Sequence, residues 1–250
     1  MACAVSKASF KRKQRRGFGR GVVWGKYERK IIMKQTLDID TLVNEAKTFC
    51  ETESLVNHSQ LFGITDGKAV GTYIQSKFQQ HLSNKYEVTI GNSANGIDLP
   101  DIHINTDIKA TSINQPQSSC PFTTARQKIY GLGYNLLVLV YEKFDSGNTC
   151  RLQFRYCTFV PNEKTADFTL TAQIIQAVNN GANKEDIIAI LQDRNIPGDS
   201  ITYNQLADEI LILPPQQGYL TISNALQWRL QYSRVIALQN TINGIKNYEW

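Results

Sequence analysis

The sequence lacks any long hydrophobic run. No stretch of its 250 residues approaches the roughly 18 consecutive apolar positions that a membrane-spanning helix needs. No apolar segment follows the N-terminal charges, so a secretory signal is not indicated either. Apolar residues make up 42% and charged residues 20% of the chain, which predicts a globular domain with or without a smaller subdomain. We therefore expect a soluble intracellular protein.

Cysteine and histidine are sparse, and their spacing is irregular. The five cysteines are an odd number without a C-x-x-C pair, and the three histidines show no spacing typical of metal ligands. Neither a disulfide framework nor a zinc site is expected from this pattern.

Acidic residues are almost absent from residues 1–32, which hold ten Lys/Arg and one Glu, a local charge of +9. Because the whole chain carries +5, residues 33–250 carry −4. Two interpretations of this basic, disordered extension stay open. It is either an arm that contacts the phosphates of nucleic acid or an upstream extension, since Met33 begins a stretch typical of a natural start that leads into a helix.

Hydrophobic periodicity predicts a mixed core over residues 33–164. Helical spacing runs through residues 38–50 and again behind Asp66, which is placed as an N-cap. The unbroken apolar run "YNLLVLVYE" is typical of a strand buried on both faces, and "CRLQFRYCTFV" alternates as an antiparallel strand does. The expected fold class is α/β (α+β), with a mixed central β-sheet flanked by helices.

The rest of the chain changes character. Residues 165–213 contain three short helical patterns separated by Gly and Pro-Gly turns, which predicts a small helical subdomain. Pro214-Pro215 then act as a hinge. The stretch "LTISNALQWRLQYSRVIALQNTING" predicts one final helix, so residues 214–250 are expected to return to the core as a C-terminal helix.

Three aspartates and a lysine lie among isoleucines in "GIDLPDIHINTDIKATS", residues 96–112. Two carboxylates bind one divalent ion only if they converge, and an extended strand separates positions six apart by roughly 20 Å. The chain must therefore turn back. A reversal that pairs Leu99 with Thr106 sets Asp98 opposite Asp107 on one face and leaves isoleucines on the core face.

Asp101 is the alternative partner of Asp107. Its register mixes core and polar faces in the neighbouring pairs, so the pattern favours Asp98. Pro100 agrees, because in the favoured register it falls in the loop, where its missing N–H costs no ladder hydrogen bond. The sequence leaves both aspartates as candidates.

Lys109 follows Asp107 by two positions, so strand alternation directs both side chains to one face. Two carboxylates with a neighbouring lysine suit the cleavage of a phosphodiester. The oxygens hold Mg²⁺, which prefers hard ligands, and the ammonium orients the attacking water and stabilises charge on phosphorus. A D-x-K triplet alone is common on solvated strands, but the apolar flanks and the buried strand that follows favour catalysis.

With these residues the sequence resembles the PD-(D/E)xK nuclease superfamily, and within it the type II restriction endonucleases. The resemblance covers residues 64–142, in the order helix, hairpin, helix and central strand, and implies a restriction-endonuclease-like core. The residues that carry it are Asp98 or Pro100-Asp101, followed by Asp107-Ile108-Lys109.

The resemblance implies sequence-specific, Mg²⁺-dependent cleavage of double-stranded DNA by an activated water. Asp98 and Asp107 would hold the metal, the Ile108 carbonyl is a further candidate ligand, and Lys109 would place the water. Family members often carry a glutamate on the preceding helix, where this chain has Gln75. We interpret Gln75 as an ordinary polar helix residue. A neutral amide coordinates metal poorly, which argues against a two-metal scheme.

Basic side chains elsewhere are candidates for DNA contacts. Arg126 and Lys128 open the helix behind the motif, where a solvated helix face is an equally good interpretation. Nearer the C-terminus, Arg229 and Arg234 are expected to touch DNA, while Trp228 packs in the core.

The resemblance also implies partners. Double-stranded DNA is the substrate, and a homodimer is expected if the recognised site is a palindrome, because two-fold protein symmetry matches two-fold DNA symmetry. A cognate DNA methyltransferase is expected to protect the host genome without forming a stable complex. No membrane partner is expected, and the expected location is the cytoplasm of a prokaryotic cell.

Two other functions stay open. A non-catalytic DNA-binding or regulatory protein could keep the nuclease fold while its acids only satisfy structure. A glycosidase could use Asp98 and Asp107 at a carboxyl spacing of about 5 Å, but Lys109 has no role there and the aromatic-rich groove expected of such an enzyme is missing from the sequence pattern.

Overall fold

The computed structural model describes residues 34–91, 96–119, 124–223, 228–238 and 242–250. The basic extension predicted for residues 1–32 lies outside the described residues. Within these ranges, no helix is both long enough and apolar enough to cross a membrane.

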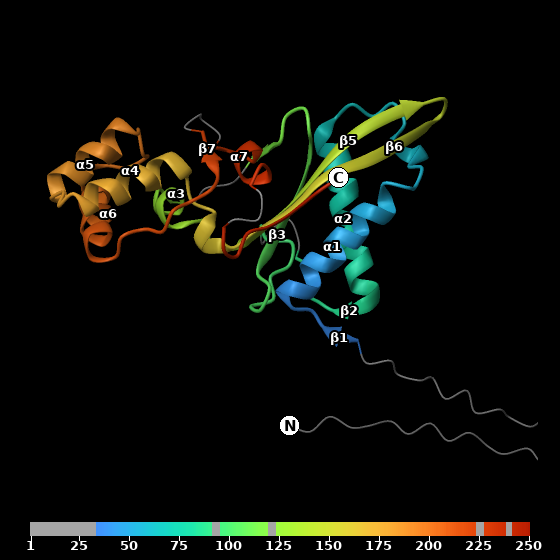
Figure 1. Cartoon of the computed structure of the whole chain (residues 1–250), viewed down its shortest axis with the longest axis horizontal. Coiled ribbons are helices and arrows are strands. Elements are labelled where there is room, and N and C mark those ends of the chain that lie inside the picture. The colour runs from blue at the N-terminus through green and yellow to red at the C-terminus, as the bar shows by residue number, and fades with distance from the viewer. Residues whose placement is uncertain (1–33, 92–95, 120–123, 224–227, 239–241) are drawn as a thin grey trace, which may run out of the picture. The chain divides into compact units, whose positions relative to one another are not determined.

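A four-stranded mixed sheet of order β3-β5-β6-β9 lies at the centre (Figure 1). β3 runs parallel to β5, whereas β5–β6 and β6–β9 are antiparallel. β5 therefore has a neighbour on each side, as its unbroken apolar run predicted, and the expected mixed central sheet is confirmed. Its strands are β3 (Thr106–Ser112), β5 (Asn135–Ser146), β6 (Thr149–Val160) and β9 (Lys246–Glu249).

Two helices, α1 (Ile39–Glu53) and α2 (Gly67–Lys85), cover one face of this sheet. Each begins where an aspartate caps it: Asp38 accepts from the Thr41 N–H at 2.7 Å, and Asp66 accepts from the Lys68 N–H at 2.9 Å. Such caps satisfy N–H groups that have no partner inside the helix. Both predicted helices are confirmed.

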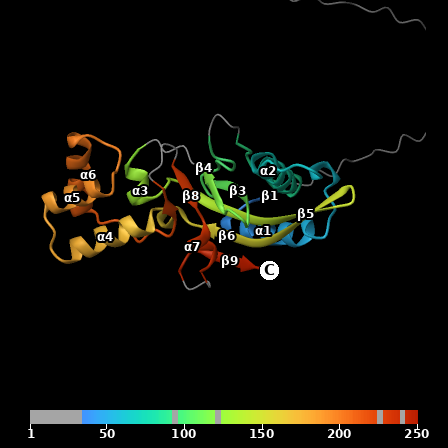
Figure 2. The same cartoon turned by 90° about the horizontal axis from the view of Figure 1, so that it is seen from above.

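The opposite face of the sheet packs on a second, three-stranded antiparallel sheet of order β4-β8-β7 (Figure 2). Two short helices and a two-residue parallel pair, β1-β2, complete this part of the chain. These elements are β1 (Gln35–Thr36), η1 (Ser59–Leu61), β2 (Tyr86–Glu87), β4 (Gln117–Ser119), β7 (Thr221–Ile222), β8 (Arg229–Gln231) and α7 (Ser233–Ile236).

The C-terminal helix predicted within residues 214–250 was wrong. The described part of this segment holds β7, β8, the four-residue α7 and β9 instead. Leu220 and Ile222 are buried on either side of the half-buried Thr221, and Leu230 and Tyr232 are buried on either side of Gln231. This is the two-residue period of strands, which over such short stretches resembles helical spacing. The segment does return to the core, because β9 joins the central sheet.

The three helices predicted within residues 165–213 are present and share an apolar core of their own with α3. Asp167 connects them to the small sheet. Its carboxylate accepts from the Leu170 N–H at the start of α4 (2.9 Å) and from the Ile222 N–H in β7 (2.8 Å). The elements are α3 (Arg126–Tyr130), η2 (Asn162–Lys164), α4 (Phe168–Asn179), α5 (Lys184–Asp193) and α6 (Ser200–Ile212).

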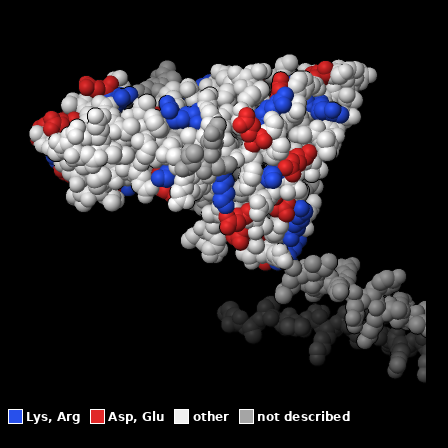
Figure 3. Space-filling model, viewed as in Figure 1, with Lys and Arg blue, Asp and Glu red and all other residues white. Residues whose placement is uncertain are grey.

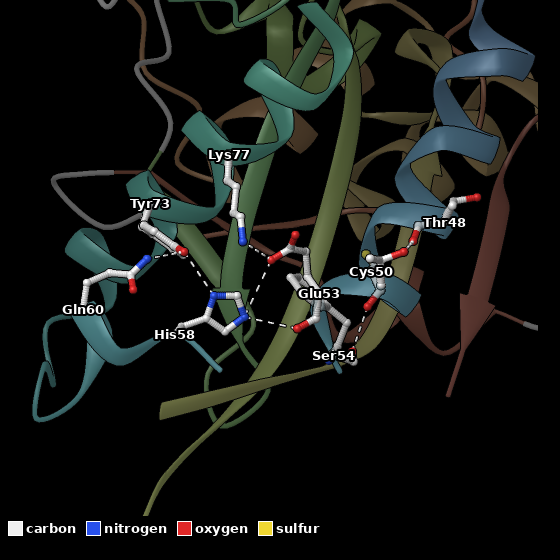
Figure 4. Close-up of polar contacts among 10 residues, drawn as sticks. Thr48, Cys50, Glu53, Ser54, His58, Gln60, Tyr73 and Lys77 are labelled. Atoms are coloured by element: carbon white, nitrogen blue, oxygen red, sulfur yellow. Dashed lines mark hydrogen bonds and ion pairs between the residues drawn. The ribbon is translucent and has the colours of Figure 1, made fainter. Parts of the chain in front are cut away.

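A buried polar network joins the end of α1 to α2 (Figure 4). His58 is 1% exposed, with Nδ1 3.1 Å from the Tyr73 hydroxyl and Nε2 3.1 Å from the Glu53 carbonyl oxygen. Lys77 forms an ion pair with the Glu53 carboxylate. Burial lowers the pKa of His58. The network fixes α2 against the turn that follows α1.

Charged side chains are mixed on the face shown in Figure 3. Lys and Arg alternate with Asp and Glu over the part built from α1, α2 and the β5-β6 hairpin, and white surface dominates the helical part. Ion pairs between these helices include Lys85 of α2 with Glu45 of α1, at 2.8 Å.

Candidate active site

A tight reversal of the chain brings the two predicted carboxylates together. Leu99 and Thr106 pair antiparallel, with N···O distances of 3.0 Å in both directions. This is the register that sets Asp98 opposite Asp107. Asn105, at a φ of 29°, lies in the turn and donates its N–H to the Asp101 carbonyl at 2.7 Å. Asn tolerates this left-handed region better than most residues do.

Asp101 does not lie opposite Asp107, as it would have to if it were the second metal ligand. Its carboxylate accepts from the Thr89 N–H at 2.8 Å, and its carbonyl accepts from the turn. Of the two isoleucines expected on the core face, Ile108 is fully buried. Ile97 is only half-buried and lines a cleft instead. The geometry therefore pairs Asp107 with Asp98.

Three donors hold the Asp98 carboxylate. Oδ2 accepts from the Ile108 N–H at 2.9 Å and from Gln75 Nε2 at 3.3 Å. Oδ1 accepts from Gln79 Nε2 at 2.9 Å. A carboxylate offers about four acceptor positions, so these bonds orient Asp98 and leave capacity for a further ligand.

Asp107 and Lys109 form a nearly buried ion pair. Lys109 Nζ lies 2.6 Å from Asp107 Oδ2, and Asp107 is 3% exposed. Burial raises the pKa of Asp107 to about 7; the charge of Lys109 opposes this rise, and the adjacent Asp98 adds to it. The site concentrates negative charge that one ammonium does not fully compensate.

Gln75 belongs to the site, so its interpretation as an ordinary polar helix residue was wrong. Its amide donates to the Ile108 carbonyl as well as to Asp98. Gln79, one helical turn later, also reaches Asp98 and was missed. The signal that could have found it is the spacing of four residues between the two glutamines, which places both on one helix face.

The close approach of α2 to β3 brings these amides into reach. Gly71 lies one turn before Gln75, and a Cβ built on it would be 2.9 Å from the Ala110 carbonyl oxygen. Glycine is required there because the neighbouring atom is backbone, which cannot rotate away.

The donor set fits a hard divalent cation. The carboxylates of Asp98 and Asp107 and the carbonyl of Ile108 are oxygen ligands of the kind Mg²⁺ prefers. No group of three or more His, Cys, Asp and Glu side chains able to hold a metal occurs among the residues that the structure describes. A cation here would therefore be held by two carboxylates and a main-chain carbonyl.

Two neighbouring clefts open on this site and share Thr72, Gln75 and Lys109 in their linings. The smaller, about 280 Å³, holds Asp98, Asp107 and Gln79. The larger, about 590 Å³, extends along β3 to β4 and β8. Its lining residues are Gly67, Lys68, Gly71, Thr72, Gln75, Lys109, Ala110, Thr111, Ser112, Gln115, Gln117, Ser118, Ser119 and Arg229.

The four residues predicted to contact DNA lie in different environments. Arg229 is exposed on the larger cleft. Arg126 instead forms a two-pronged ion pair with Glu209 of α6, at 2.6–3.0 Å. Lys128 is 4% exposed, and its Nζ lies 5.6 Å from the ring centre of Trp228.

Arg234 stacks on an aromatic ring, with its guanidinium 3.9 Å from the ring centre of Phe168. Trp228 is half-buried against the second core, in agreement with the packing role predicted for it. Structural partners therefore engage Arg126, Lys128 and Arg234, and Arg229 is the predicted contact that opens on the cleft next to Lys109.

Comparisons with known proteins identify a family. The family model described as "Type II restriction enzyme NspV" matches residues 36–247, which include every site residue named above. The type II restriction enzyme NspV of Nostoc sp. (strain ATCC 29411 / PCC 7524) is 52% identical over 211 residues, covering 84% of this chain and 95% of that protein. No solved structure matches the chain. The chain belongs to the NspV family of type II restriction enzymes.

Proposed function

We propose that this restriction enzyme cleaves double-stranded DNA by Mg²⁺-dependent hydrolysis, with Asp98, Asp107 and Lys109 as its catalytic groups. The observation that carries the proposal is the convergence of two carboxylates and an ammonium on one cleft, with Lys109 Nζ 2.6 Å from Asp107. Membership of a type II restriction enzyme family supports the substrate and the reaction type.

The chain supplies the ligands. Asp98 and Asp107 would hold the cation together with the Ile108 carbonyl, and Gln75 and Gln79 orient Asp98 through its two oxygens. When bound, the cation supplies Lewis-acid polarisation of the phosphate and a lower pKa for the attacking water.

Lys109 works beside the carboxylates. Its side chain is 20% exposed, so the ammonium reaches the cleft while keeping its contact with Asp107. From there it donates hydrogen bonds that orient the water and stabilises the negative charge that develops on the phosphate oxygens. The preorganised pair is fixed by strand alternation on β3 and therefore needs little rearrangement.

The assembly and its context are part of the proposal. A homodimer would cut both strands of a palindromic site through one active site per protomer. A cognate methyltransferase would protect the host genome without a stable complex, and the enzyme would act in the prokaryotic cytoplasm, where the DNA lies.

Cleavage of plasmid DNA tests the reaction. With Mg²⁺, wild-type protein is expected to give discrete fragments with 5′ phosphates, and a chelator is expected to abolish them. Lys109→Ala should lower the cleavage rate by at least about 100-fold while leaving DNA binding in place. Lys143→Ala is the matched control, because Lys143 also forms an ion pair with an aspartate two positions away, at 2.5 Å from Asp145, and lies outside both clefts described above.

The outcome that contradicts the proposal is retarded but intact DNA at every Mg²⁺ concentration. That result would favour a non-catalytic DNA-binding protein with the same fold. Equal cleavage by Lys109→Ala and Lys143→Ala would instead remove Lys109 from the mechanism.

A further inference from the structure

We propose that the outward face of the small sheet β4-β8-β7 reads base edges, with Gln117 and Arg229 as specificity-determining residues. The proposal rests on the proposed function, since it names the part of the molecule that selects the DNA sequence to be cut. It concerns side chains that take no part in the hydrolysis itself.

The two faces of this sheet differ in chemistry. The register pairs Gln117 with Gln231 and Ser119 with Arg229, and alternation therefore places these four side chains on one face. The intervening residues point the other way. Leu230 is fully buried in the second core, and the Ser118 hydroxyl lies 2.5 Å from the hydroxyl of Tyr232.

The outward face carries donors and acceptors without partners. Among the described residues, the side chains of Gln117, Ser119, Arg229 and Gln231 form no hydrogen bond or ion pair. Amide and guanidinium groups are the ones that pair with two atoms of adenine and guanine, respectively, in the major groove. The major groove admits a two-stranded β-ribbon, and β4 and β8 form such an antiparallel pair.

The charge of the larger cleft suits the same ligand. Its described lining includes Lys68, Lys109 and Arg229 and no acidic residue, although residues 33–250 as a whole carry −4. Positive charge is thus concentrated where the backbone of a polyanion would pass between β4 and the catalytic carboxylates.

A contact between β3 and β4 sets the distance between Gln117 and the catalytic site. Thr111, on the same face of β3 as Asp107, accepts from the Gln117 N–H at 3.2 Å and donates to the Gln117 carbonyl at 3.1 Å. Four strand residues span roughly 13 Å, and successive phosphates of one DNA strand are about 3.4 Å apart along the axis. The bases that Gln117 reads therefore lie within about four nucleotides of the scissile phosphate.

Binding and cleavage with altered sites test the proposal. The recognised sequence is first obtained by sequencing the ends of DNA cut by wild-type protein. Gln117→Ala and Arg229→Ala are then compared with wild type on duplexes that carry this sequence, each single base-pair change in it, and an unrelated sequence. Binding is measured in chelator and cleavage in Mg²⁺. Gln192→Ala and Arg151→Ala are matched controls, because both residues are exposed and lie outside the larger cleft.

Each specificity variant should lose about 10–100-fold in preference for the recognised sequence, at one or two base pairs, with little change in binding to the unrelated duplex. The controls should keep wild-type preference. Unchanged preference in both variants would overturn the proposal. An equal loss on all duplexes would also overturn it, since that pattern indicates phosphate contacts alone.

Folding and the proposed function are tested separately. Circular dichroism identifies any variant that fails to fold, and Gln117→Glu and Arg229→Lys, which keep side-chain length, then decide by the same comparison. If wild-type protein cuts no DNA at all, the proposed function fails. If it cuts one sequence and all variants keep that preference, only the reading role of β4 and β8 fails.

Discussion

Lys109 contacts Asp107 at 2.6 Å, yet the pKa of Asp107 is raised to about 7. An ammonium this close normally lowers the pKa of a carboxyl group. The rise means that burial of Asp107, together with the nearby Asp98, outweighs the attraction of Lys109. Metal-free protein therefore keeps a carboxylate whose ionisation costs folding free energy at neutral pH and above.

Asp107→Asn should stabilise the metal-free protein at pH 8.5. The folded pKa of about 7 lies above the ordinary value of 3.8, so the folded state holds the extra proton between these values. Stability from this group is therefore present at low pH and lost as pH rises through about 7. Urea unfolding in chelator should show the variant gaining about 1–3 kcal/mol relative to wild type between pH 5 and pH 8.5. A difference that stays constant with pH would contradict a raised pKa of Asp107.

Gln75→Glu should make stability depend on divalent cations. The new carboxylate would face the Ile108 carbonyl and Asp98, where the amide now donates. In chelator we expect a loss of about 1–3 kcal/mol, and Mg²⁺ should restore more of the melting temperature than it does for wild type. Gln80→Glu, on the exposed side of the same helix, is the control. Equal melting behaviour of the two variants would remove Gln75 from the site.

His58→Gln should cost most above neutral pH. Burial lowers the pKa of His58 below its ordinary value of 6.5, so the unfolded state binds the proton first. The stability that His58 contributes is present above about pH 6.5 and declines as pH falls towards the lowered folded pKa. Unfolding free energies should differ by about 1–3 kcal/mol at pH 7.5, with a smaller gap at pH 5.5. A gap that widens on acidification would show that the folded state binds the proton more tightly than the unfolded state does.

Asp167→Ala should destabilise the protein more than Asp199→Ala. Both aspartates cap helices, but Asp167 is 4% exposed and also accepts from the Ile222 N–H in β7, whereas Asp199 is exposed. We expect losses of about 2–4 kcal/mol and about 1 kcal/mol, respectively, by denaturant unfolding. Similar losses would mean that the link to β7 adds nothing.

Local patterns predicted the parts of the fold that depend on neighbouring residues. The cap at Asp66 and the buried strand around Leu137 were both predictable, because each needs only residues close in sequence. The register that pairs Leu99 with Thr106 was predictable for the same reason: one register separates core and polar faces, and the other mixes them.

The errors arose where distant segments decide the structure. β8 exists because it pairs with β4, more than a hundred residues earlier, and three residues are too few for a clear period. Gln75 gained its role from the docking of α2 on β3. Its spacing from Gln79 indicates a shared helix face, but not which strand that face meets. Arg126 was placed by Glu209, a partner on another helix.

Gly71 sets α2 directly against the main chain of β3. The spacing between the amides and the catalytic strand is thus measured from backbone to backbone, without a side chain as a spacer. Neighbouring side chains can adopt other rotamers when a core residue beneath the helix is replaced. A methyl group at Gly71 would instead meet the Ala110 carbonyl oxygen and force α2 away from β3. The absence of a side chain at this position is therefore part of what sets the geometry of the catalytic strand.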